Sequence, residues 1–298
     1  MALERAKRAR ALPGEVRGIL IMLLGMALFG LMDGATKFLA HQYAPTQILW
    51  LRFLFSVPLM LVVLAPRGIM GVLRSRAPWL QLLRTVLMVV EMGLVVWAFG
   101  MMPLADAHAI LAICPLVITA LSVPMLGERV GMRRWLAVLV GFLGVLLIVR
   151  PGAGVMSTGA VVALVATVLY AFYQVLTRIV GRVDRAETSL LLMFGGGAVL
   201  LSFVGPVNWR TPEPWHWPFF LSLAVLGTGG HYCVIRALQL APAVVVQPFS
   251  YAMLIWAVLI GWLVFGDFPD AWTISGALVI AAAGIYSAIR QHRLPSSA

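Results

Sequence analysis

The sequence has few charged residues: Asp, Glu, Lys and Arg make up 11% of its 298 residues, against roughly 25% in an ordinary soluble protein. Hydrophobic residues make up 62% of the chain. A chain with this composition has too little polar surface to stay folded in water. The composition therefore excludes a soluble globular protein and indicates an integral membrane protein.

Cysteine is also scarce, and sequence motifs for catalysis are missing. Cys114 and Cys233 both fall in apolar runs, so neither a disulfide framework nor metal-ligand spacing is indicated. The chain lacks His-Glu-x-x-His, Gly-x-Ser-x-Gly, an Asp-rich prenyl-diphosphate motif and a Walker-type phosphate loop. We therefore expect no metal, no cofactor, no catalytic residue and no direct use of ATP.

Acidic residues are outnumbered: the chain has 22 Lys and Arg but only 11 Asp and Glu, which gives a net charge of +11. Such a basic chain raises nucleic acid as a partner. Here 17 of the 22 basic residues lie at the termini and in alternate connectors, whereas the other connectors hold only Arg150 and Arg210. Lys and Arg gather on the cytoplasmic side of membrane proteins and near anionic lipid headgroups. We therefore expect membrane lipid as a partner, no nucleic acid, and both termini in the cytoplasm.

Long apolar runs are what the sequence has in abundance. A membrane-spanning helix needs about 20 mostly apolar residues, and ten such stretches can be marked. They cover residues 18–39, 46–65, 79–101, 104–123, 132–149, 158–180, 188–205, 216–238, 242–265 and 271–289. The runs are continuous rather than alternating, which favours helices over barrel strands. We predict an all-α integral membrane protein with ten transmembrane helices.

The basic segment before the first run has the form of a signal-peptide start. The run that follows is too long for a signal peptide and has no small-residue cleavage site at its end. We therefore expect it to be retained as the first helix.

The two halves of the chain align weakly. Offsets of 141 and then 139 place Phe29 on Tyr170, Thr36 on Thr177, Lys37 on Arg178, Pro103 on Pro242, Gly127 on Gly266 and Glu128 on Asp267. Each half has five predicted helices, and an odd number places the halves in opposite orientations. The basic connector that follows Gly127 also corresponds to a connector without Lys or Arg after Gly266. Similar sequence with reversed charge indicates an inverted-topology repeat, as in secondary transporters.

This repeat divides the chain. We predict a basic cytoplasmic segment over 1–17, a first repeat over 18–149, a connector over 150–157, a second repeat over 158–290 and a cytoplasmic tail over 291–298.

Three stretches carry a family resemblance. They are Met102-Pro103-Leu104-Ala105-Asp106-Ala107, Pro124-Met125-Leu126-Gly127-Glu128-Arg129 and Gly141-Phe142-Leu143-Gly144-Val145. With the five-plus-five plan they resemble the EamA-type members of the drug/metabolite transporter superfamily over nearly the whole chain. The resemblance implies a multi-pass secondary transporter in a bacterial inner membrane that works by alternating access. Family members move amino acids, riboflavin-like vitamins, S-adenosylmethionine-like nucleosides, sugars and drugs.

Ionisable side chains inside membrane helices are costly unless paired or hydrated, so each is a functional candidate. Asp33 and Arg52 lie about 10 Å and 9 Å from the outer ends of the first two predicted helices. They form either a structural salt bridge between adjacent helices or a functional site, which binds a substrate carboxylate or acts as a gate; such a pair could also receive both charges of a zwitterion. Glu91, in the middle of the third helix, is either a proton-coupling carboxylate or a fixed partner of Arg84 or Arg52. His108 belongs either to the cavity or to the packing.

The repeat predicts matching polar groups on the inner side. Asp33 maps to Gln174 and His108 maps to Gln247, while His231 lies at a similar depth in the eighth helix. Because these groups are neutral, we expect them to hydrogen-bond to substrate and expect any coupling to protons or another ion to reside in the first half.

Aromatic residues suggest a lining for the cavity. Tyr170, Tyr173 and Gln174 share one face of the sixth helix by their spacing, and Tyr251 lies one turn from Gln247. This pattern is either an aromatic-lined cavity for planar substrates or ordinary packing.

Pro115 and Pro248 lie inside the fourth and ninth helices. Proline frees a backbone carbonyl and permits bending. Both residues are candidate hinges.

The leading hypothesis is a secondary transporter of small organic metabolites, with amino acids, including aromatic ones, as the favoured substrate. Riboflavin- or S-adenosylmethionine-like compounds are the alternative, followed by efflux of drugs or quaternary amines. The non-transporter alternatives are a membrane-embedded enzyme and a receptor. The direction of transport and the oligomeric state are left open.

Overall fold

The computed structural model describes residues 14–64, 74–127, 131–149, 157–241 and 246–292, and the described part is helical without strands. The helices of the first half are α2 (Gly14–Ala40), α3 (Pro45–Leu64), α5 (Pro78–Met101), α6 (Leu104–Leu111), α7 (Cys114–Leu126) and α8 (Met132–Val149). Those of the second half are α9 (Thr158–Val180), α10 (Ala186–Val204), η2 (Pro214–His216), α11 (Trp217–Leu240), η3 (Gln247–Tyr251), α13 (Ala252–Phe265) and α14 (Ala271–His292).

The predicted all-α membrane fold is confirmed. Within the described residues, seven helical segments are long and apolar enough to cross a membrane, and shorter apolar helices cover residues 135–149, 249–265 and 271–286. The ten-span topology stays a prediction. The first helix begins at Gly14 and the last extends to His292, so both are longer than predicted. The rest of the expected terminal segments, residues 1–13 and 293–298, lies outside the described residues.

Two of the predicted helices are interrupted. The fourth is split into α6 and α7, and Pro115 lies in the first turn of α7. The proline ring clashes with the carbonyl four residues earlier, and that residue is Leu111, where α6 ends. In the ninth, the 3₁₀ helix η3 precedes α13. The break between α6 and α7 lies at residues 112–113. Adding the repeat offset of 139 gives residues 251–252, where η3 meets α13, so the two interruptions are at equivalent positions.

The two interrupted helices also end alike. Gly127 (φ 67°) ends α7 and Gly266 (φ 73°) ends α13, and both glycines adopt the left-handed conformation. Side chains with a Cβ rarely adopt this conformation, so glycine is favoured at such a helix end. The two positions are repeat-related, so a related sequence makes the same stop in both halves.

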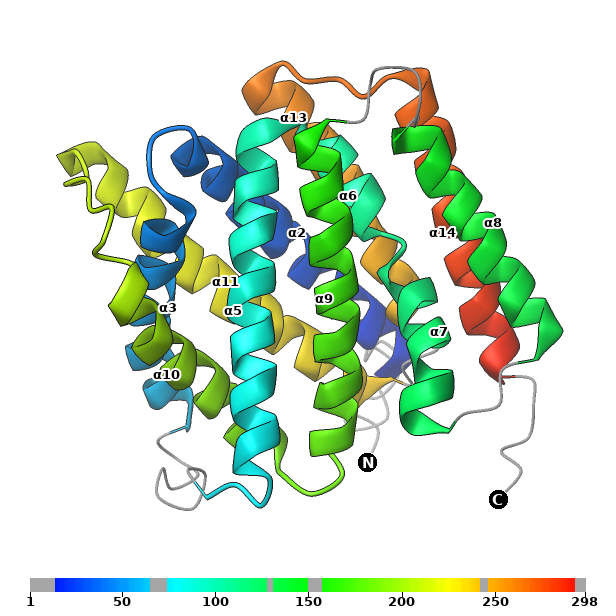
Figure 1. The fold of residues 1–298 in the computed structure, drawn as a ribbon, viewed down its shortest axis with the longest axis horizontal. Coiled ribbons are helices and arrows are strands. Elements are labelled where there is room, and N and C mark those ends of the chain that lie inside the picture. Colours follow the sequence, from blue (N-terminus) through cyan, green and yellow to red (C-terminus); the bar gives the residue numbers. More distant parts are fainter. Residues whose placement is uncertain (1–13, 65–73, 128–130, 150–156, 242–245, 293–298) are drawn as a thin grey trace, which may run out of the picture.

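The helices pack in pairs (Figure 1). Helix α2 packs on α11, α5 on α9, α3 on α10 and α8 on α14. Exchanging the halves maps the α2–α11 pair onto α9–α5 and maps each of the other two pairs onto itself. The start of α2 and the end of α14 lie on the same side, together with the basic α9–α10 connector. We call this the basic side. The opposite side, where α13 ends, is called the outer side after the orientation predicted from the sequence.

The α8–α14 interface gives the first testable prediction. A Cβ on Gly276 would lie 2.6 Å from the Gly144 carbonyl oxygen and 2.5 Å from Ile148 Cγ1. Because a backbone atom cannot move aside like a side-chain end, we expect Gly276→Ala to cost about 1–3 kcal/mol of unfolding free energy. Thermal unfolding of the purified protein measures this. Gly93→Ala is the matched control, because its Cβ would meet only Leu49 Cδ1 at 3.9 Å. Equal unfolding temperatures for both variants would contradict the packing argument.

Candidate functional site

Asp33 and His108 meet in the centre of the fold. The Asp33 carboxylate on α2 lies 3.0 Å from His108 Nε2 on α6, in a close contact that lacks the angle of a hydrogen bond. Both side chains are buried. The predicted ion pair between Asp33 and Arg52 is not formed, since no carboxylate oxygen of the described residues lies within 4.0 Å of the Arg52 guanidinium. Asp33 instead joins α2 to α6 through the histidine.

Arg52 on α3 is buried, with 5% of its surface exposed. Its Nε has no hydrogen-bond partner among the described residues. The guanidinium lies against α11, where a Cβ on Gly227 would be 3.2 Å from Nη2. Asp33, Glu91 and His231 all interact electrostatically with it. A buried charge with a free donor is costly unless water or a ligand supplies the partner, so Arg52 is equipped to bind an acceptor group.

Glu91 on α5 is also buried, and no hydrogen bond or ion pair to its carboxylate is found within the described ranges. The interpretation that it is a fixed partner of Arg84 is wrong. Arg84 donates to the Gln81 side chain at 3.1 Å, to Tyr173 Oη at 3.4 Å and to the Ser189 carbonyl. Arg84 therefore ties α5 to α9 and α10. Of the two cations considered for Glu91, Arg52 is the one within electrostatic range, without an ion pair between them in the described part of the chain.

The aromatic group on α9 divides into two parts. Tyr170 and Tyr173 stack with ring centroids 5.8 Å apart, and Gln174 Nε2 donates to Tyr170 Oη at 3.1 Å. The Arg84 guanidinium lies 5.4 Å from the Tyr173 ring centroid. Tyr173 is thus held by a structural partner, whereas Tyr170 lies within electrostatic range of Glu91.

Polar groups on α11 of the second half lie near Arg52. His231 on α11 has its ring edge against Phe29 at 5.0 Å and Phe194 at 6.1 Å between centroids. Its Nε2 and the neighbouring Thr228 hydroxyl are buried without hydrogen-bond partners in the described part of the chain. Buried polar atoms without partners are uncommon in folded proteins. These groups therefore have capacity for water or a ligand.

The remaining predicted residues lie in and around the two interrupted helices. The Tyr251 hydroxyl is buried without a partner among the described residues and lies against Gly284 of α14. Gln247 and Pro248 belong to η3, but their side chains lie outside the described part. Pro115 begins α7. The structure thus gathers Asp33, Arg52, Glu91, His108 and His231 from five helices and leaves the roles of the others as predictions.

Two functional candidates were missed from the sequence. Arg84 was considered only as a partner of Glu91 and Lys37 only as a repeat position, yet both are buried and have other partners. Lys37 pairs with Asp267 at 2.6 Å. The partners lie far apart in the sequence, so local spacing could not reveal them. The available signal was the charge itself, because an ionisable residue in an apolar helix requires a partner.

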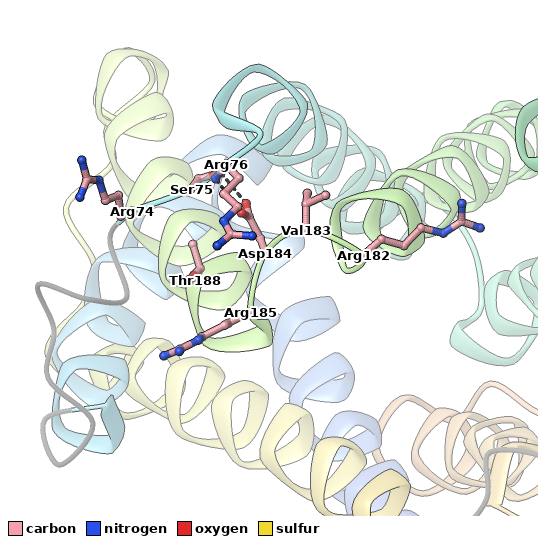
Figure 2. A pocket seen from close by; sticks show the side chains of 8 residues that line it. All are labelled: Arg74, Ser75, Arg76, Arg182, Val183, Asp184, Arg185 and Thr188. Atoms are coloured by element: carbon pink, nitrogen blue, oxygen red, sulfur yellow. Dashed lines mark hydrogen bonds between the residues drawn. The ribbon is translucent and has the colours of Figure 1, made fainter.

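A polar pocket lies on the basic side (Figure 2). Its volume is about 620 Å³, and it lies where the α9–α10 connector meets the residues before α5. It is lined by Arg74, Ser75, Arg76, Arg182, Val183, Asp184, Arg185 and Thr188. Asp184 accepts hydrogen bonds from the Ser75 hydroxyl, the Arg76 backbone N–H at 2.7 Å and Gln81 Nε2 at 2.9 Å. Gln81 in turn accepts from Arg84, so this network links the pocket to the aromatic group on α9.

Asp184 gives a prediction for pH dependence. Partial burial opposes ionisation, but the hydrogen bonds from Ser75, Arg76 and Gln81 outweigh it and lower the pKa of Asp184 below its ordinary value of 3.8. A depressed folded-state pKa stabilises the protein above the unfolded-state pKa, and the stabilisation is lost as pH falls through the folded-state pKa. We expect Asp184→Asn to cost about 1 kcal/mol or less at neutral pH. The difference in unfolding temperature should shrink as pH falls from about 5 toward 3, and a difference that grows would contradict this role.

A metal site is not formed by the described residues, because no three His, Cys, Asp or Glu side chains among them lie close enough to hold an ion.

Comparisons with known proteins match most of the chain. A family model described as the EamA-like transporter family matches residues 16–150 and 157–289. The riboflavin transporter of Vibrio cholerae serotype O1 is 29% identical over 89% of this chain and 90% of its own. The S-adenosylmethionine uptake transporter of Rickettsia prowazekii is 24% identical over 96% of this chain and 97% of its own. A crystal structure with 19% identity has a TM-score of 0.63 over 95% of this chain and 99% of that chain, which shows a shared fold.

Proposed function

Because the chain belongs to the EamA-like transporter family, we propose that it moves a planar, polar organic metabolite across a bacterial inner membrane by alternating access. The observation that carries the proposal is the group of buried polar atoms without partners in the described part. Arg52 comes from the first half, and His231 and Thr228 come from the second. A site made by both halves changes its access when one half rocks against the other.

Riboflavin-like compounds are the favoured substrate class. A relative that is 29% identical over most of both chains is named a riboflavin transporter. The site offers groups suited to such a ligand. The Arg52 Nε–H can donate to ring carbonyl oxygens, and the Phe29 and Phe194 rings, which pack against His231, offer aromatic surface. Aromatic surfaces favour planar rings through stacked or edge-on contacts.

A cationic nucleoside of the S-adenosylmethionine type is the second candidate. The observation that favours it is Glu91, a buried carboxylate without an ion pair among the described residues. A relative at 24% identity carries that substrate in its name. The amino-acid hypothesis rested on an Asp33–Arg52 pair that receives a zwitterion. The structure places Asp33 on His108, and neither relative named above is named as an amino-acid transporter.

Ligand-induced stabilisation tests the substrate class. The purified protein is heated with riboflavin, S-adenosylmethionine, phenylalanine or a quaternary amine, since a ligand that binds the folded state raises the unfolding temperature. We expect riboflavin to give the largest shift and expect Arg52→Met to abolish it. The matched control Arg210→Met removes an arginine of the outer α10–α11 connector. A shift with phenylalanine alone would overturn the proposed class in favour of amino acids.

A further inference from the structure

Lys37 forms an ion pair that connects the two halves of the molecule. The residue lies near the outer end of α2, and only 3% of its surface is exposed. Its ammonium group lies 2.6 Å from Asp267 Oδ2, 3.3 Å from the Met102 carbonyl oxygen and 4.8 Å from the centroid of the Phe265 ring. Lys37 and Met102 belong to the first half, whereas Phe265 and Asp267 belong to the second.

The geometry of Asp267 comes from the end of α13. Gly266 adopts the left-handed conformation, and the Asp267 backbone N–H donates to the Gly261 carbonyl at 2.9 Å. This turn fixes the residue that carries the carboxylate directly after the helix, next to the end of α2. The carboxylate is partly hydrated, since 35% of its side chain is exposed, against 4% for Lys37.

An apolar cluster lies next to this pair. The described cluster consists of Phe99, Leu104, Ala107, Ala257 and Ile260, with Met102 and Phe265 packed against it. It joins α5 and α6 of the first half to α13 of the second. Helix α2 approaches α13 closely at the same level, because a Cβ on Gly34 would lie 2.7 Å from Ile260 Cγ2. Two partners of Lys37 therefore belong to the edge of a dry contact between the halves.

We propose that the Lys37–Asp267 pair is an outer latch, which holds the halves together in this arrangement and separates when the central site opens to the outside. The proposal rests on the alternating-access function proposed above. The repeat places Arg178 and Glu128 at the equivalent positions on the basic side, and Glu128 lies outside the described residues.

Burial predicts unequal effects for the two partners. In Asp267→Asn the charged Lys37 ammonium stays buried without a carboxylate partner. An unpaired buried charge carries a desolvation cost, and opening the outer side to water relieves it. In Lys37→Met the carboxylate that is left alone is already partly hydrated, so the closed state loses less. Each substitution therefore changes the relative populations of the outer-closed and outer-open states. We therefore expect Asp267→Asn to open the outer side more than Lys37→Met.

The test measures access from outside to a residue that is buried when the latch is closed. Ala257 is fully buried in the cluster, so Ala257→Cys is introduced into a background in which Cys114 and Cys233 are replaced by Ala. Intact cells are treated with a membrane-impermeant maleimide, and the labelling rate is measured. We expect a rise of about tenfold or more with Asp267→Asn and of roughly two- to threefold with Lys37→Met. The exchanged pair Lys37→Asp/Asp267→Lys should restore a slow rate.

Glu213→Gln is the matched control, because it removes a carboxylate from another outer connector. A labelling rate for Asp267→Asn equal to that of this control would overturn the latch, as would a larger effect of Lys37→Met. If Asp267→Asn does not fold, as judged by its unfolding temperature, Asp267→Ser is measured in its place. Labelling needs no substrate, so a failed latch and a failed transport assay are distinguishable.

Discussion

Replacing Arg52 by Met is expected to lower substrate uptake roughly 10- to 100-fold. A hydrogen bond to a charged group is worth about 1.5–3 kcal/mol, and each 1.4 kcal/mol corresponds to a tenfold change in affinity, as an approximate rule. The same variant should unfold at an unchanged or higher temperature. The Arg52 guanidinium is buried, has no ion pair within the described ranges, and leaves Nε without a partner, so its removal relieves a desolvation cost.

Arg84 supplies the matched control for this prediction. It is a buried arginine on a neighbouring helix, but it donates to Gln81, Tyr173 and Ser189. Arg84→Met should therefore lower the unfolding temperature, because several buried acceptors lose their donor. Uptake and thermal unfolding measured on both variants separate binding from structure. If Arg52→Met unfolds early and Arg84→Met does not, the assignment of the two arginines is wrong.

Glu91→Gln is expected to abolish accumulation of substrate driven by a pH gradient while exchange of bound substrate continues. A carboxylate within the membrane that binds and releases a proton during the transport cycle links the proton gradient to the substrate gradient. For one proton per substrate, a difference of one pH unit supports roughly tenfold accumulation. The variant should therefore bring the ratio of inside to outside substrate from about ten to about one. Glutamine preserves the size of the side chain, and Glu91 has no fixed partner within the described ranges to lose.

Asp33→Asn is the comparison for Glu91→Gln, because Asp33 is a buried carboxylate that already contacts His108. We expect this variant to retain pH-driven accumulation at a reduced rate. Full accumulation by Glu91→Gln would contradict the coupling role of Glu91. If only Asp33→Asn loses pH-driven accumulation, the coupling role belongs to the Asp33–His108 contact instead of Glu91.

The sequence predicted the helical membrane fold because composition and run length are local properties. Breaks in the helices were partly visible as well, since Pro115 lies at the start of α7 and its clash falls at the end of α6. The 3₁₀ form of residues 247–251 was not foreseen. The apolar stretch over residues 242–265 has no periodicity that separates a 3₁₀ turn from an α-helical one.

Partners of the charged residues could not be predicted for a different reason. Depth along a helix follows from counting residues, and it placed Asp33 and Arg52 at similar levels. The direction of each side chain depends on how the helices are rotated, and in an apolar helix the hydrophobic pattern is too weak to give this rotation. Asp33 consequently meets His108 rather than Arg52, and the Lys37–Asp267 pair appears only when both halves are placed together.

The most direct test of the central claim is uptake of labelled riboflavin by proteoliposomes that contain the purified protein, with empty liposomes and the Arg52→Met variant alongside. The account predicts saturable uptake that unlabelled riboflavin blocks and phenylalanine does not, and that falls roughly 10- to 100-fold in the variant. Uptake no higher than in empty liposomes, from protein shown to be folded, would contradict the proposed substrate class.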